Sequence, residues 1–258
     1  MKRAIILLAG VAALAACGGP PRPRIPARVI DRALASAPGE AQPSKIVSAE
    51  IAFARMAREE GQWTAFRAFA APGAMIHGQD GAIPAMPWLA QQSDPPAAVQ
   101  WSPREIWMSC DGALAISSGR FVDPDGKVGN FLTVWERQGD GEYRWSYDTG
   151  VPDDPQPPAP ARAQEGDIIV TAMDRVRGHV ADCRKAGDAA LPAISGELLG
   201  DGDQSAIKLS RDGTLAWRWA HVGAAGAGRR VFTSAIFMDG AWQPAMTADW
   251  GAVSGAAE

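Results

Sequence analysis

Two ionisable side chains in the middle of the chain, His77 and Asp148, are the candidates for acid–base chemistry. An imidazole exchanges protons near neutral pH, whereas a carboxyl does so only where an apolar cavity raises its pKa. Each residue also has a simpler interpretation, which we favour: His77 as a solvent-facing loop residue beside Gly78, and Asp148 as a turn or cap residue before Thr149. We therefore assign no catalytic residue and keep His77 and Asp148 as weak candidates.

Three further side chains are candidates for a ligand pocket. Arg120 and Asn130, on neighbouring expected strands, could bind an anionic or carbonyl group or simply line the sheet. Trp88 lies where a cap over a cavity is expected and could close over a ligand, whereas most of the ten tryptophans are expected in the core. Tyr147 could donate to an oxyanion, but strand alternation puts it on the face opposite Asp148, so we expect no Tyr–Asp pair in one cavity.

Two of the three cysteines, Cys110 and Cys183, lie far apart in the sequence. In an oxidising compartment they suggest one disulfide, and two buried free thiols are the alternative. No Cys-x-x-Cys or His-x-x-x-His spacing indicates a metal site. No phosphate loop, dinucleotide fingerprint or Gly-x-Ser-x-Gly elbow indicates a cofactor or a nucleophile, so we expect neither a metal nor a cofactor.

The N-terminus has the pattern of a secretory signal. Lys2 and Arg3 precede an unbroken run of small and apolar residues from Ala4 to Ala16. This run is too short to span a bilayer, which needs ~20 residues. The pattern therefore predicts a signal peptide of residues 1–16.

The end of the run, Leu14-Ala15-Ala16-Cys17, resembles the bacterial lipobox. The resemblance implies cleavage before Cys17 and acyl chains on that cysteine, and more than one chain anchors a protein stably to a membrane. By resemblance to lipoprotein sorting in bacteria with two membranes, Gly18 in place of an aspartate favours the outer membrane over the inner one, on the periplasmic side of the cell envelope. The alternative is an ordinary secretory signal followed by a chance cysteine.

Composition and proline-rich breaks set the layout of the mature chain. The 258 residues are 47% hydrophobic and 21% charged, as in ordinary globular proteins. A net charge of −4, which becomes more negative without Lys2 and Arg3, gives no electrostatic footprint for nucleic acid. The expected parts are a lipidated cysteine with a tether, a first domain, a linker, a second domain and a tail, at residues 17–43, 44–151, 152–163, 164–251 and 252–258.

The first domain is expected to be α+β, with helices packed on one face of an antiparallel sheet. Apolar residues recur at helical spacing from Ser44 to Gly61 and again from Trp63 to Ala70. A short strand at 74–77 and a helical turn at 87–92 follow. The period then changes to two, and turns rich in Asp and Gly separate four expected strands, at 101–109, 113–122, 127–137 and 143–149.

Several short motifs of this region are shared with a known superfamily. They are Gly119-Arg120, Asp123-Pro124-Asp125-Gly126-Lys127, Leu132-Thr133-Val134-Trp135, Asp140-Gly141 and Asp148-Thr149-Gly150. On these motifs, residues 44–151 resemble a bacterial branch of the nuclear transport factor 2-like superfamily, the SnoaL-like or ketosteroid-isomerase-like cone fold. Tyr143 departs from the branch, which usually has tryptophan there. The resemblance implies a curved sheet capped by helices, a cone-shaped cavity open at one end and, in many members, a homodimer formed through the sheet.

The second domain is expected to be a small β-rich module with one helix. The helix is predicted over Asp167–Ala186, and hairpins are predicted around the turns Asp212-Gly213 and Asp239-Gly240. Trp217 and Trp219 alternate onto one face, which we interpret as a core face rather than an exposed docking surface.

These patterns together predict an exported protein, anchored to a membrane through lipid on Cys17, whose cone binds a small apolar ligand or a protein partner without catalysis. Members of the superfamily use the cone for isomerisation, cyclisation, dehydration, binding or subunit contact, so the fold alone cannot choose among them. A small-molecule enzyme of the isomerase, dehydratase or hydrolase type is the first alternative. A structural adaptor in the cell envelope is the second, and a homodimer is compatible with all three.

Overall fold

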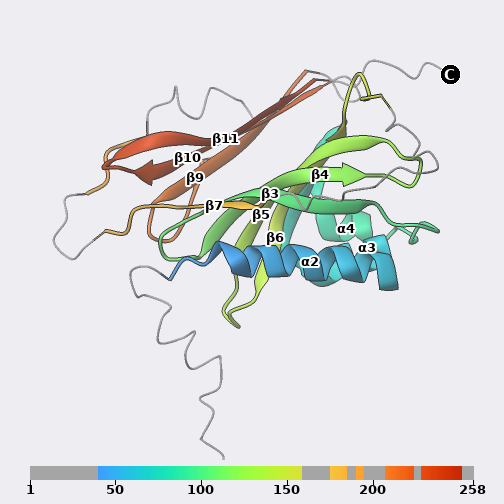
Figure 1. Cartoon of the computed structure of the whole chain (residues 1–258), viewed down its shortest axis with the longest axis horizontal. Helices are drawn as coiled ribbons and strands as arrows, with labels where there is room; N and C mark the ends of the chain where they lie inside the picture. The colour runs from blue at the N-terminus through green and yellow to red at the C-terminus, as the bar shows by residue number, and fades with distance from the viewer. Residues whose placement is uncertain (1–39, 159–174, 185–189, 195–206, 224–227, 252–258) are drawn as a thin grey trace, which may run out of the picture.

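The computed structural model describes residues 40–158, 175–184, 190–194, 207–223 and 228–251. These residues form three layers, in which helices cover one face of a seven-stranded sheet and a four-stranded sheet covers the other (Figure 1). The predicted signal peptide and Cys17 lie outside the described residues. Among the helices that are described, none is both long and apolar enough to cross a membrane.

The helical layer consists of α2 (Pro43–Glu60), α3 (Gln62–Phe69) and α4 (Ala85–Leu89). Ile46, Phe53 and Ala57 form the buried stripe of α2, at the spacing of an amphipathic helix. Gly61 ends this helix with a φ of +122°, a conformation that favours glycine. The two long helices therefore begin and end within a few residues of their predicted positions.

The larger sheet has the strand order β2-β1-β6-β5-β4-β3-β7. Its strands are β1 (Ala70–Gly78), β2 (Gly81–Pro84), β3 (Gln100–Met108), β4 (Leu114–Val122), β5 (Val128–Arg137), β6 (Tyr143–Pro152) and β7 (Arg177–Val180). Strands β3 to β6 form the predicted antiparallel meander, whereas β1 pairs in parallel with β6. Register shifts interrupt three of the strand pairs, and such bulges bend a sheet. The mixed α+β class with a curved sheet is confirmed.

Two segments differ from their prediction. β1 runs through the Pro72-Gly73 pair, which was expected to end a helix and precede a short strand. Residues Arg177–Val180 form a strand that pairs in parallel with β3, so the helix predicted over 167–186 is wrong there. The pairing with β3 outweighs the helical apolar spacing of this segment. Residues 167–174 lie outside the described part of the chain.

The second sheet has the order β11-β10-β9-β8 and packs on the outer face of the first. Its strands are β8 (Lys208–Leu209), β9 (Leu215–Val222), β10 (Arg229–Met238) and β11 (Ala241–Trp250). Leu132 and Tyr147 of the first sheet share one apolar cluster with Trp217 and Phe232 of the second. Trp217 is buried, in agreement with the expected core role. The predicted separate C-terminal domain is not supported by this shared cluster.

The two meanders begin with the same turn. Ser109–Leu114 precedes β4 and Ser210–Leu215 precedes β9, and both follow the pattern Ser-x-Asp-Gly-x-Leu. In each turn the serine Oγ donates to the aspartate Oδ1 at 2.7 Å, and the leucine N–H donates back to the serine Oγ, at 3.1 and 3.0 Å. The glycines have φ values of +63° and +74°. One local sequence pattern thus forms the first turn of each meander, between β3 and β4 and between β8 and β9.

Candidate functional site

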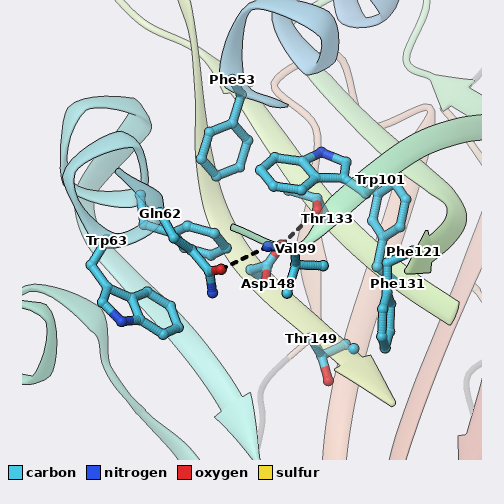
Figure 2. Close-up of a pocket in the computed structure, with 12 residues that line it drawn as sticks. Phe53, Gln62, Trp63, Val99, Trp101, Phe121, Phe131, Thr133, Asp148 and Thr149 are labelled. Atoms are coloured by element: carbon cyan, nitrogen blue, oxygen red, sulfur yellow. Dashed lines mark hydrogen bonds between the residues drawn. The ribbon is translucent and has the colours of Figure 1, made fainter. Parts of the chain in front are cut away.

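The candidate site is a pocket of about 260 Å³ between α2, α3 and the inner face of the larger sheet (Figure 2). Its volume is just below the ~300–1,000 Å³ typical of small-molecule sites. Six aromatic side chains from two helices and three strands line it: Phe53, Trp63, Phe66, Trp101, Phe121 and Phe131. The other lining residues are Gln62, Val99, Thr133, Asp148, Thr149 and Gly150. The pocket is therefore apolar, with one carboxyl group in its wall.

Contacts among the rings hold the shape of this pocket. Phe53 of α2 packs against Phe66 and Trp101, with ring centroids 4.8 Å apart in both pairs. Phe121 of β4 lies across Gly129 of β5, where a Cβ atom would be 2.2 Å from the Phe121 Cζ atom. A glycine at position 129 is therefore required for the position of the Phe121 ring.

Asp148 lies inside β6, and its carboxyl faces the pocket (Figure 2). Its Oδ2 atom accepts a hydrogen bond from Thr133 Oγ1 on the neighbouring strand at 2.7 Å. Burial raises the pKa of Asp148 from 3.8 to about 7; the Thr133 hydrogen bond opposes this shift and the charge of Glu50 adds to it. The favoured prediction of a turn or cap aspartate was wrong, because β6 continues to Pro152.

Glu50 is a second buried carboxyl, and the sequence analysis did not identify it. It projects from α2 and is 1% exposed. It accepts hydrogen bonds from Trp101 Nε1 at 3.0 Å, Ser117 Oγ at 2.5 Å and Trp135 Nε1 at 3.1 Å. Burial raises the pKa of Glu50, and the three hydrogen bonds oppose that shift. The signal that could have revealed it is a glutamate on the apolar stripe of a helix, between Ile46 and Phe53.

His77 lies on the opposite side of the sheet from the pocket. It is buried on β1, with Nδ1 2.7 Å from Tyr147 Oη and Nε2 3.1 Å from His221 Nδ1. Burial, together with the charges of His221 and Arg230, lowers the pKa of His77 from 6.5 to about 4. The prediction of a solvent-facing loop was wrong, because the second sheet covers this strand. Tyr147 does lie on the face opposite Asp148, as strand alternation predicted.

The three predicted pocket residues do not line the pocket. Arg120 and Asn130 lie on the outer face of the sheet, where Arg120 Nη1 donates to Asn130 Oδ1 at 2.7 Å and forms an ion pair with Asp153. They border a separate groove of about 560 Å³ beside β11. Trp88 of α4 packs edge-on against the pocket residue Trp63, with centroids 5.0 Å apart, and so supports the wall from behind.

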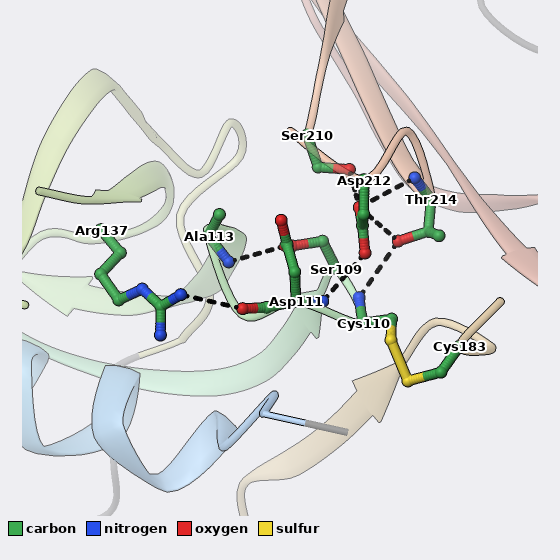
Figure 3. The surroundings of a disulfide bond; sticks show 9 residues. All are labelled: Ser109, Cys110, Asp111, Ala113, Arg137, Cys183, Ser210, Asp212 and Thr214. Carbon is green, nitrogen blue, oxygen red and sulfur yellow. Dashed lines mark hydrogen bonds between the residues drawn. A yellow bond between two sulfur atoms is a disulfide. The ribbon is translucent and has the colours of Figure 1, made fainter. Parts of the chain in front are cut away.

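Cys110 and Cys183 form a disulfide (Figure 3), the bridged alternative of the two that the cysteine count left open. Beside it, the backbone N–H of Asp111 donates to Asp212 Oδ2 at 2.9 Å, and the N–H of Cys110 donates to Thr214 Oγ1 at 3.1 Å. These two hydrogen bonds fasten the first turn of the second sheet to the first sheet, and the disulfide joins the turn before β4 to the segment that follows β7.

Within the described ranges, no group of three or more His, Cys, Asp or Glu side chains is arranged to hold a metal ion. The pocket wall offers Asp148 as its one carboxyl. Metal sites in proteins use several such ligands at once, so the chemistry of this wall fits an organic ligand better than an ion.

Comparisons with known proteins place the chain in no family. No family model matches it, and no curated protein matches its sequence. One similar solved structure is an NTF-2-like protein of unknown function from Shewanella oneidensis MR-1. The two share 16% identity over 42% of this chain and 98% of that chain, with a TM-score of 0.36. The layers and the pocket described above rest on the contacts of this chain alone.

Proposed function

We propose that this protein is an exported, lipid-anchored binding protein that holds a small molecule in the aromatic pocket. The observation that carries the proposal is a pocket of about 260 Å³ whose wall holds six aromatic rings and a single carboxyl. Apolar walls supply affinity by removing ligand surface from water, and a few polar groups orient the ligand.

The ionisable group and the hydroxyl groups of the wall favour binding over catalysis. Among the described lining residues, Asp148 is the only ionisable one. The Thr133 hydroxyl donates to Asp148, and the Thr149 hydroxyl donates to the backbone oxygen of His77 at 2.9 Å. Both threonine protons are thus directed at protein acceptors, which leaves neither as an oxyanion donor for a substrate.

Acid–base catalysis by Asp148 is the second candidate function. One observation favours it: the pKa of about 7 lies where a carboxyl can both give and take a proton at neutral pH. An enzyme of this kind would lose turnover on Asp148→Asn but keep its affinity for a neutral substrate. A binding protein has no turnover to lose.

The membrane anchor is a separate part of the proposal and rests on the lipobox resemblance at Cys17. The disulfide between Cys110 and Cys183 is compatible with export, because such bonds persist in oxidising compartments.

Native mass spectrometry of the full chain, extracted from membranes in mild detergent, tests the binding function. We expect a co-purified small molecule on the wild-type protein. Val99→Phe fills the pocket from its rim and should remove the adduct, whereas Val122→Phe, at an exposed position, should retain it. An adduct that persists on Val99→Phe would place the ligand elsewhere, and unchanged NMR spectra of the indole groups during a screen of small apolar compounds would reject the pocket as a binding site.

A further inference from the structure

The charge of the pocket distinguishes between classes of ligand. Asp148 lies in its wall, and Glu50 lies close enough behind the rings for its charge to act on Asp148. No lysine, arginine or histidine is among the described residues that line the space. The nearby cation Arg67 has its guanidinium directed at the backbone oxygen of Leu89, at 2.7 Å. The interior is thus neutral or negative, with no basic group to receive an anion.

The rings add to this preference. The face of an aromatic ring is negative because of its quadrupole, and cations bind over it. Trp101 lines the pocket while its indole N–H donates to the buried carboxyl oxygen of Glu50 at 3.0 Å. Donation of this hydrogen bond polarises the indole, so its face becomes a better partner for a positive charge.

We infer that the pocket selects a small organic cation, such as a substituted amine or a quaternary ammonium ion, held between the aromatic rings and the carboxylate of Asp148. This inference rests on the proposed binding function and names the chemical class of its ligand. An anion would lie near two carboxyl groups and would find no positively charged side chain among the described lining residues. A neutral ligand would gain the apolar contacts and hydrogen bonds from the protonated Asp148 or the Gln62 amide, but no attraction between opposite charges.

The protonation of Asp148 is coupled to this choice. In the unliganded pocket, burial and the charge of Glu50 disfavour the carboxylate of Asp148. A cation in the same space supplies the missing opposite charge and so lowers the pKa of that carboxyl. Binding of a cation that has no proton of its own must therefore release protons from the protein near neutral pH. A neutral ligand releases none, because it prefers the protonated form.

Choline and 3,3-dimethylbutan-1-ol form a matched pair of probes, since the second replaces the charged nitrogen of the first by carbon. We expect choline to bind the purified full chain about tenfold more tightly than the alcohol at pH 8, by calorimetry. Asp148→Asn should abolish the preference for choline, and it should not weaken binding of the alcohol, because the uncharged amide resembles the protonated carboxyl that a neutral ligand prefers. Asp153→Asn removes a carboxylate from the outer face of the same sheet and should change neither affinity.

Calorimetry in two buffers of different ionisation enthalpy measures the protons released. At pH 7 we expect about half a proton per bound choline, because a carboxyl with a pKa near 7 is then half protonated. The alcohol and the Asp148→Asn variant should release none.

The outcomes separate the two proposals. If the alcohol binds as tightly as choline, or if choline binds without proton release, the cation inference is overturned and the binding function stands. If neither probe shifts the indole NMR signals of Trp63 and Trp101 at any concentration up to its solubility limit, both proposals are overturned. Selective binding of choline, lost in Asp148→Asn and retained in Asp153→Asn, supports both.

Discussion

The raised pKa of Asp148 makes the protein less stable as the pH rises, and the substitution Asp148→Asn should remove this dependence. The carboxyl titrates near 3.8 in an unfolded chain and at about 7 in the folded protein. Between these values the folded state keeps a proton that the unfolded state has lost, so raising the pH destabilises the fold. The full shift corresponds to about 4 kcal/mol, reached above pH 7, and water that enters the pocket reduces that figure.

Asp148→Asn keeps the size of the side chain and an acceptor for the Thr133 hydroxyl, but it cannot ionise. We expect its stability to match the wild type near pH 4 and to exceed it by up to about 4 kcal/mol at pH 8. The measurement is urea unfolding followed by circular dichroism at half-unit steps from pH 4 to 8. Asp153→Asn, on the outer face, is the control and should show no such growing advantage.

The difference between variant and wild type is the quantity to compare, because His77 acts in the opposite direction. Its pKa falls from 6.5 to about 4 on folding, so its contribution to stability is present above pH 6.5 and is lost as the pH falls towards 4. The two effects nearly cancel in the wild type over this window. With Asp148 replaced, stability should rise visibly from pH 4 to 6.5. A difference between Asp148→Asn and wild type that is constant from pH 5 to 8 would refute the placement of this carboxyl in an apolar pocket.

Three other experiments test separate parts of the structure. Cys110→Ser with Cys183→Ser opens a loop of 73 residues and should cost about 4 kcal/mol in urea unfolding, and two reactive thiols in the denatured, unreduced wild type would contradict the bond. Glu50→Ala leaves three buried donors without their acceptor and should cost roughly 3 kcal/mol or more, whereas Glu50→Gln should cost less; equal losses would show that packing, not hydrogen bonding, sets the effect. Cys17→Ser should move the protein from the membrane pellet to the supernatant after fractionation without detergent, and continued pelleting would count against lipidation.

The elements that the sequence predicts best are those whose structure is determined by residues close together in the chain. The meander β3 to β6 follows from alternating side chains and from turns whose glycines have positive φ, such as Gly112 and Gly126. The parallel pairings of β1 with β6 and of β7 with β3 join segments far apart in the chain. No short pattern encodes such a pairing, which explains why Arg177–Val180 was predicted as part of a helix.

The candidate site likewise has features that the local sequence predicts and features that depend on distant segments of the chain. Alternation along β6 correctly separates Tyr147 from Asp148, but it does not say which face is covered by helices and which by a second sheet. The covering of the outer face by the second sheet determines that His77 is buried and not exposed. The strands that bury it come more than a hundred residues later in the chain. The burial of Glu50 could have been predicted from the local sequence, because a charged residue on the buried stripe of an amphipathic helix needs a partner inside the protein.

The second sheet also bears on self-association. The cone resemblance implied a homodimer through the sheet, and a dimer through any surface stays a prediction. On the outer face of the sheet, however, Leu132 and Tyr147 are buried against Trp217 and Phe232 of the same chain. Because β9 to β11 follow the same turn motif and the same strand order as β4 to β6, this chain covers the face with a second meander of its own. A dimer through that face would have to displace the second sheet and expose its apolar cluster, at about 25 cal/mol for each Å² of apolar surface returned to water. Contact between two copies is therefore expected to use other surfaces, which leaves the aromatic pocket, on the opposite side of the larger sheet, free for its ligand.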